Sequence, residues 1–256
     1  MYKPKQVSSA LDKQAYGKVK YTGTTVPALS DYLIDIWEAQ SHIDATGYIS
    51  DMIVVDGCID LIVDLITKEI GFYGSSETVF NMQTKLPISC FGFRFKPGAF
   101  HALTKLDAHS TMETTLPLTE FDKDFNEDAF FDLDYDEKKE FLIKYFLELA
   151  KRKPSKSYIE LFDRINIKKI HTVKDLSDFL ALSPRQTHRV FMKNYGMPPL
   201  KVLSIIRFQH CLQELTSEHP SQENFEDGYY DQSHFINDFK KNIGLTPTDF
   251  FKNYRK

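Results

Sequence analysis

The stretch that decides the fold is GYYDQSHFINDFKKNIGLTP, residues 228–247, near the end of the chain. Gly228 is typical of a turn, and Asp231 is a good N-cap residue for the helix that follows. Phe235 and Phe239 lie four residues apart, which predicts the buried face of that helix. Polar side chains are left for the opposite face. The stretch therefore predicts a short, capped helix with an exposed polar surface.

A similar unit lies upstream in TVKDLSDFLALSPRQTHRVFMKNYGMPP, residues 172–199. Thr172 with Asp175 and Ser183 with Gln186 have the spacing of two capping boxes. They predict two short helices joined by a tight turn, and the second begins with polar residues that face outward. This is the layout of a helix-turn-helix, whose second helix lies in the major groove of DNA.

Between the two units, Leu200–Leu215 predicts one amphipathic helix with Arg207 on its outer side. About sixteen residues at 1.5 Å each give a rod of roughly 24 Å. With the radii of the flanking units added, the two polar helices are expected about 34 Å apart, which is one turn of duplex DNA.

These motifs resemble the arabinose-operon regulator (AraC/XylS) family of bacterial transcription factors. The resemblance covers residues 172–256 and is most specific in LSPRQTHRVF, in Arg207-Phe208 and in the stretch quoted first. It implies a DNA-binding domain of seven helices, with two recognition helices in successive major grooves.

Carried over position by position, the resemblance implies DNA contacts from both recognition helices. Base contacts are implied for Arg185, His188, Arg189, Gln232, Ser233 and Asn237. Phosphate contacts are implied for Gln186, Lys193, Arg207, Lys240 and Lys241. Arginine–guanine pairs are expected to discriminate most strongly, at about 1–3 kcal/mol each.

The chain departs from the family pattern in residues 221–227, the helix expected before the second turn. That helix is normally apolar, but here it is acidic, and only Phe225 is suited to anchor it. An acidic face beside a groove repels phosphate. Asn237 also stands where the family often has a basic residue. We therefore expect the first unit to dominate DNA affinity.

The N-terminal part is predicted to be β-rich, a partial barrel. Leu29–Ala39 predicts a helix, Ala99–Leu106 a short helix, and Asp56-Gly57 a hairpin turn. The predicted strands are Gly47–Val55, Cys58–Ile66, Ile70–Tyr73, Glu77–Gln83 and Ile88–Phe95. Residues 27–122 also resemble an uncharacterised sensor-like domain that precedes this DNA-binding module in related regulators.

Two interpretations of the aromatic residues in this part stay open. Most of them are expected in the core, but Phe93, Arg94 and His101 are candidates to line a ligand pocket. Arg94 would then bind an effector's carboxylate or phosphate. Pairing of Arg94 with Asp60 or Asp64 on a neighbouring strand is the favoured alternative.

The predicted fold class is α+β, with a β-rich domain followed by an all-α domain of about seven helices. We divide the chain into a β-rich domain predicted to be sensory at 1–135, an amphipathic helix and basic linker at 136–156, and a DNA-binding domain at 157–256. The apolar stripe of the helix at 136–153 is expected to pack on its own domain, and dimerisation through it is the alternative.

Charge is distributed unevenly along the chain. The net charge is −4, yet residues 168–256 hold 13 Lys and Arg against 10 Asp and Glu. A basic module beside an acidic one is compatible with DNA binding. Three widely spaced cysteines indicate reduced thiols and a cytoplasmic location. The polar start predicts no signal peptide, and the aspartates in the longest apolar run predict no membrane span.

An enzyme is the competing class. Cys58 lies near Asp56 and Asp60, but nothing in the sequence brings a base to it, and no phosphate loop or zinc motif is present. We predict no catalytic residue, metal or cofactor. The prediction is a regulator whose partner is double-stranded DNA, modulated by a small-molecule effector or by homodimerisation. A regulator without a ligand is the runner-up, and RNA polymerase contact, the operator and the direction of regulation stay open.

Overall fold

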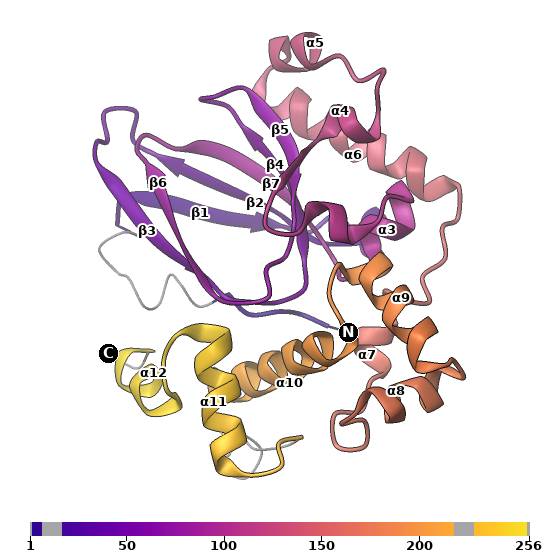
Figure 1. The fold of residues 1–256 in the computed structure, drawn as a ribbon. Coiled ribbons are helices and arrows are strands. Elements are labelled where there is room, and N and C mark those ends of the chain that lie inside the picture. Colours follow the sequence, from indigo (N-terminus) through magenta and orange to yellow (C-terminus); the bar gives the residue numbers. More distant parts are fainter. Residues whose placement is uncertain (1, 7–16, 218–227, 255–256) are drawn as a thin grey trace.

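The structure is a computed structural model that describes residues 2–6, 17–217 and 228–254 (Figure 1). A β-rich N-terminal part is followed by a helical C-terminal part, as the sequence predicts. The strands form a six-stranded antiparallel sheet in the order β1-β2-β7-β4-β5-β8 and a separate ribbon of β3 and β6. They are β1 (Val19–Thr24), β2 (Leu33–Ser41), β3 (Tyr48–Ile53), β4 (Ile59–Asp64), β5 (Glu69–Tyr73), β6 (Phe80–Lys85), β7 (Ser89–Phe95) and β8 (Thr115–Pro117).

The helix predicted at Leu29–Ala39 is wrong, because most of that segment is strand β2. A bulge between Leu33 and Asp35 shifts its register against β7, so Leu33 and Ile36 both face the core beneath the sheet. Ala39 is buried on the other side of the strand. Both faces are covered, and the resulting three-residue spacing of buried positions imitates a helix.

One face of the large sheet is covered by α6 (Tyr135–Lys151), which begins at a capping box formed by Asp134 and Glu137. The Phe146 ring of α6 lies 5.6 Å from that of Phe93 and 5.0 Å from that of Phe95. The apolar stripe of α6 thus packs on its own domain, the favoured of the two alternatives. Shorter elements complete this part: η1 (Pro27–Leu29), α3 (Ala99–Thr104), η2 (Ala108–Thr111), α4 (Leu118–Phe121) and α5 (Glu127–Asp132).

The C-terminal part contains both predicted recognition helices. Its described helices are α7 (Leu161–Arg164), α8 (Val173–Leu180), α9 (Pro184–Tyr195), α10 (Pro199–Leu215), α11 (Gln232–Ile243) and α12 (Pro247–Tyr254). The acidic segment expected to form the helix before α11, residues 221–227, lies outside the described residues. Across the described residues, no helix combines the length and apolar character that a bilayer span requires.

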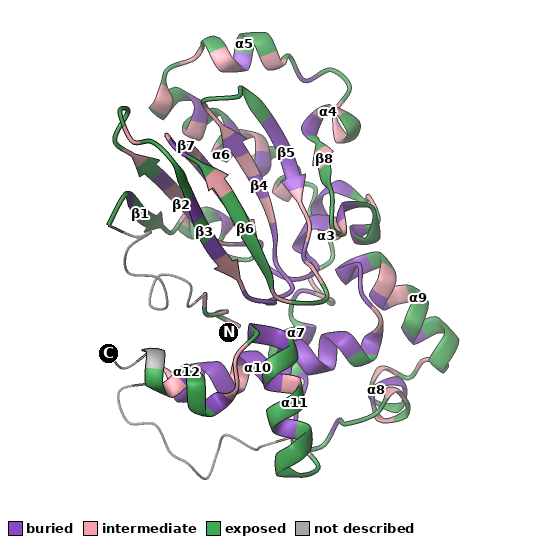
Figure 2. Cartoon of the chain, turned by 60° about the vertical axis from the view of Figure 1, so that its left-hand side comes forward, coloured by how far each residue is buried: buried purple, intermediate pink, exposed green. Residues whose placement is uncertain are grey.

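The linker helix α10 is buried almost all round rather than amphipathic (Figure 2). Arg207, predicted to face outward, is only 7% exposed. Its guanidinium lies 5.7 Å from the Tyr229 ring, and the backbone at Gly228 packs against its side chain. The loop that leads into α11 therefore covers Arg207, so the predicted outward orientation of its side chain is wrong, while its phosphate contact stays a prediction.

The N-terminal part packs directly on α10. Val54 and Val55, which follow β3, belong to the same hydrophobic core as α8–α12. Gln209 of α10 is fully buried, and its Nε2 donates to Val55 O at 2.9 Å. Its Oε1 accepts a hydrogen bond from Lys5 N at 2.8 Å. The extended N-terminal segment, residues 2–6, is thereby held between the β-rich part and α10.

A buried polar cluster fixes α11 against α10. Lys201 Nζ donates to Asn242 Oδ1 at 2.7 Å, and Ser204 Oγ donates to Asp238 Oδ1 at 2.7 Å. Asn242 Nδ2 also donates to Ser204 Oγ at 3.3 Å. Burial lowers the pKa of Lys201 to about 8. The cluster gives the α10–α11 packing a directional component that apolar contacts lack.

The pH dependence of stability should reveal the buried Lys201. Between its pKa of about 8 in the fold and the ordinary 10.5, only the unfolded chain carries the proton. Because the unfolded state then binds more protons, raising the pH through this range favours folding. As the pH rises through this range, the free energy of unfolding of the wild type should increase relative to that of Lys201→Met. Denaturant titration at several pH values measures both. A difference between the two that does not change with pH would contradict the assignment.

Gly92 of β7 is required by Trp37 of β2. A Cβ at position 92 would lie 2.4 Å from two ring atoms of Trp37, so Gly92→Ala must displace the indole. We expect a loss of about 1–3 kcal/mol in the free energy of unfolding. Gly23→Ala in β1 is the matched control, because its nearest neighbour lies at an ordinary 3.5 Å. Equal stabilities of the two variants in chemical denaturation would refute the steric argument.

Candidate DNA interface

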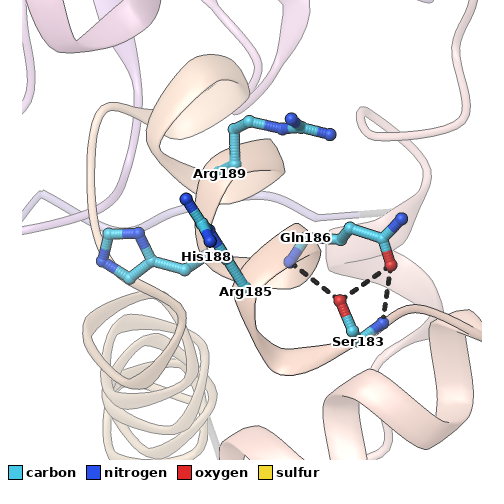
Figure 3. A pocket seen from close by; sticks show the side chains of 5 residues that line it. All are labelled: Ser183, Arg185, Gln186, His188 and Arg189. Atoms are coloured by element: carbon cyan, nitrogen blue, oxygen red, sulfur yellow. Dashed lines mark hydrogen bonds between the residues drawn. The ribbon is translucent and has the colours of Figure 1, made fainter.

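The start of α9 is fixed by its cap. Gln186 N donates to Ser183 Oγ at 3.3 Å, and Ser183 N donates to Gln186 Oε1 at 2.9 Å (Figure 3). Pro184 occupies the first turn, where no backbone donor is needed. Both predicted capping boxes are present, and the tight turn between α8 and α9 contains Ala181 in a left-handed conformation.

The outer face of α9 is polar and exposed. Arg185, His188 and Arg189 project from it and line a shallow depression with Ser183 and Gln186 (Figure 3). The inner face holds the helix in place through two buried aromatic rings and one hydrogen bond. Phe191 and Tyr195 are buried in the core, and Thr187 Oγ1 shares a 2.9 Å hydrogen bond with Ser177 of α8. The cationic side chains are thus carried on a helix whose orientation is set by packing. Lys193, one turn further on, is exposed as well.

Helix α11 repeats this arrangement. Asp231 caps it by accepting a hydrogen bond from His234 N at 2.7 Å, and Phe235 and Phe239 are buried. The predicted contact residues on the helix are all exposed: Gln232, Ser233, Asn237, Lys240 and Lys241.

The same surface carries two apolar residues that the sequence analysis did not select. Tyr230 is 93% exposed, and Ile236 is 38% exposed. The helical period that buries Phe235 and Phe239 also turns Ile236 outward, so the sequence contained the signal. Both residues add apolar contact area to the candidate interface.

In Figure 1, α9 lies at one end of α10 and α11 lies at the other. With 17 residues, α10 is about 25 Å long at 1.5 Å per residue. A buried helix therefore connects the two units, and the spacing of about one DNA turn between their polar faces stays a prediction. The C-terminal end of α9 also packs on the N-terminal part, where His109 Nδ1 lies 3.1 Å from Gly196 O.

A cavity of about 510 Å³ lies on the face of the large sheet opposite α6, beneath the β3–β6 ribbon. Arg94 lines it and forms ion pairs with Asp56 and, at 3.2 Å, with Asp60. The pairing of Arg94 with Asp60, favoured from the sequence, is therefore present. Burial raises the pKa of Asp60 to about 7, and the nearby Asp35 contributes to the rise while the hydrogen bond from Trp37 opposes it.

The other two candidate ligand residues do not reach this cavity. Phe93 is fully buried on the opposite face of the sheet, against α6. The ring of His101 lies at the end of α3, where Nδ1 is 2.6 Å from Leu106 O. Phe93 and Arg94 are neighbours on β7, and adjacent residues of a strand face opposite sides of its sheet, so Phe93 cannot join Arg94 in the cavity. The residues that join Arg94 in the cavity come from other strands and had no local signal in the sequence.

Two family models match the chain. A helix-turn-helix domain matches residues 176–253, and a domain of unknown function (DUF6597) matches residues 25–117. The search of curated proteins found no match.

Several solved structures are similar to the chain. The C-terminal domain of the response regulator yesN from Fusobacterium nucleatum is 29% identical, covering 38% of this chain and 92% of that one, with a TM-score of 0.32. The C-terminal domain of AraT, a response regulator from Geobacillus stearothermophilus, is 24% identical, covering 36% and 78%, with a TM-score of 0.32. Unsaturated fatty acid bound ToxT from Vibrio cholerae is 12% identical, covering 92% and 94%, with a TM-score of 0.38.

The helix-turn-helix match falls on the segment in which the capped helices α8 and α9 and the exposed helix α11 are found. The chain is therefore a DNA-binding transcriptional regulator, with a helix-turn-helix domain that follows a domain of unknown function.

Proposed function

We propose that the protein reads an asymmetric DNA site by placing α9 and α11 in adjacent major grooves of one duplex. The observation that carries this proposal is the pair of exposed polar helix faces at the two ends of the buried helix α10. A separation of about one DNA turn suits two helices that enter the same face of a duplex. Because α10 is packed all round, it would hold that separation when the protein binds.

The side chains on α9 suit base recognition. Arg185 and Arg189 are exposed, and a guanidinium matches the O6 and N7 acceptors of guanine. His188 lies between them on the same surface. Lys193 would contact phosphate, and Gln186 would do so through its amide nitrogen, because its oxygen is held in the helix cap.

The α11 surface would contribute less to affinity. Gln232, Ser233 and Asn237 are uncharged and would contact bases, while Lys240 and Lys241 would contact phosphates near the end of the helix. Neutral side chains release no counterions from DNA, so they add little to its electrostatic attraction.

The N-terminal part would act as the regulatory domain in the cytoplasm. It contains a cavity of a volume usual for small-molecule sites, and Asp56 in the wall of that cavity accepts a hydrogen bond from Gln6 at 2.8 Å. The neighbouring residue Lys5 is hydrogen-bonded to Gln209 of α10. A ligand that moves Asp56 would therefore alter the contacts that position α10. Dimerisation through the stripe of α6 is not part of this proposal, because that stripe is covered by the sheet.

Substitution of Arg189 should impair DNA binding more than substitution of Asn237. Arg189→Ala removes a charged, bidentate donor, and we expect a loss of about 1–3 kcal/mol in binding free energy. Asn237→Ala should cost less. The measurement is quantitative footprinting on a site selected from random duplexes.

Lys20→Ala serves as the control, because it removes a positive charge from an exposed position of β1. It should bind DNA like the wild type. Equal losses from Arg189→Ala and Asn237→Ala would refute the ranking of the two units, and unchanged binding by both would refute the proposed interface.

Gln209 should transmit the state of the N-terminal part to the DNA-binding helices. Gln209→Leu leaves Lys5 N and Val55 O without their side-chain partner. Because unpaired buried polar groups are costly, we expect the packing around α10 to loosen and the DNA affinity of the full chain to change several-fold. Gln213→Leu is the control, since the hydrogen bond that Gln213 Nε2 donates to Lys3 O is exposed to solvent. Identical DNA affinities of the two variants would argue against this route.

A further inference from the structure

The cavity beneath the β3–β6 ribbon has the chemistry of a cation site. We propose that it binds a small organic cation, a protonated amine or quaternary ammonium compound with an apolar body. This inference rests on the effector role proposed above and names the class of effector. The cavity lies between the two sheets and is walled by β2, β4 and β7 on one side and by β3 and β6 on the other.

Within the described part of the chain, Arg94 is the one arginine that lines the cavity, and it is already engaged. Arg94 is paired with both Asp56 and Asp60, and Asp56 also accepts hydrogen bonds from Gln6 and from Cys58 N. An anionic ligand would have to displace these buried carboxylates before it could reach Arg94. That exchange would leave the displaced carboxylates without a partner inside the protein, which is strongly unfavourable.

Negative charge is in excess around the cavity. Among the described residues, four carboxylates line it, against one arginine and one lysine: Asp35, Asp51, Asp56 and Asp60, against Arg94 and Lys5. Asp35 lies opposite Arg94 in the β2–β7 ladder, yet its Oδ1 is buried and accepts no hydrogen bond from the residues that the structure describes. Because Asp35 lines the cavity, its carboxylate brings an unfilled acceptor next to the space that an ammonium group would occupy.

Two of these carboxyl groups have raised pKa values, and burial is the main cause. Burial raises the pKa of Asp35 above its ordinary value, although Arg94 opposes the rise. The pKa of Asp60 is raised as well, with burial again the largest cause. Both shifts mean that ionised carboxylates are disfavoured in this environment. A cation beside them would offset that cost and lower both values.

The remaining wall is aromatic and apolar. Trp37 lies flat against the backbone of β7 at Gly92, and its Nε1 donates to Asp60 Oδ1 at 2.8 Å. The ring is thus held beside Asp60 in the wall of the cavity that it lines. Among aromatic residues, tryptophan attracts a cation to its ring face most strongly, and Trp37 lies beside the carboxylates. Further apolar surface comes from Tyr21, Ile62, Tyr73, Phe80 and Met82.

The test uses Trp37 itself, because it is the only tryptophan of the chain. The full-length protein is titrated with 4-phenylbutylamine and, separately, with 4-phenylbutyrate, which share the apolar body and differ in the sign of charge. Tryptophan emission is recorded. We expect a saturable change with the amine at a concentration at least tenfold below any change with the carboxylate. Equal binding, tighter binding of the carboxylate, or no saturable change with either probe would overturn the proposal.

Variants separate a site from a non-specific charge effect. Asp35→Asn should weaken the amine about tenfold or more, in line with a lost charge pair in a partly buried site. Asp44→Asn removes the same charge from an exposed turn outside the cavity and should leave the amine affinity unchanged. Thermal unfolding of both variants shows whether the fold is intact. An intact Asp35→Asn protein with wild-type amine affinity would overturn the assignment.

Footprinting in the presence of the amine distinguishes this inference from the proposed function. If the protein binds DNA but not the amine, the proposed DNA recognition stands and the proposed cation site is overturned. A saturable amine signal without any effect on DNA binding supports the cation site and removes the effector role.

Discussion

The burial of α10 is the constraint on which the rest of this structure depends. The helix is covered by α8 and α9, by α11 and by the β-rich part, so nearly every residue from Pro199 to Gln209 is inaccessible. A helix packed on all sides cannot rotate or bend without disturbing each neighbour, since protein interiors are close-packed. The separation and mutual orientation of the two recognition helices are therefore properties of the whole molecule, and the DNA-binding part does not set them alone.

The contacts of α10 differ in character on its two sides. Toward the recognition helices the packing is apolar, with the Lys201, Ser204, Asp238 and Asn242 cluster adding direction. Toward the β-rich part, Gln209 hydrogen-bonds to backbone atoms of two segments that border the cavity. Apolar packing tolerates small displacements, whereas buried hydrogen bonds are either made or lost. A signal that crosses from the cavity to α10 would therefore act as a discrete change.

The cavity and the recognition helices also differ in their electrostatics. The candidate DNA surface exposes arginine and lysine on α9 and lysine on α11, whereas carboxylates predominate in the cavity. A cationic ligand would enter a region of negative potential, and DNA would approach a region of positive potential. One chain with a small net charge can therefore attract two oppositely charged partners to separate surfaces.

The sequence by itself determined the local elements whose signals lie within a few residues. The capping boxes at Thr172 and Ser183, the buried pair Phe235 and Phe239, and the strands between residues 47 and 95 all follow from local spacing. The strand at Leu33–Ser41 was missed because a bulge and two covered faces gave it the period of a helix. Only the tertiary structure decided that Arg207 is covered, that Arg94 is already paired, and that Asp35 and Trp37 share a cavity. These facts depend on which distant segments meet, and a linear pattern records the face of an element but not what covers it.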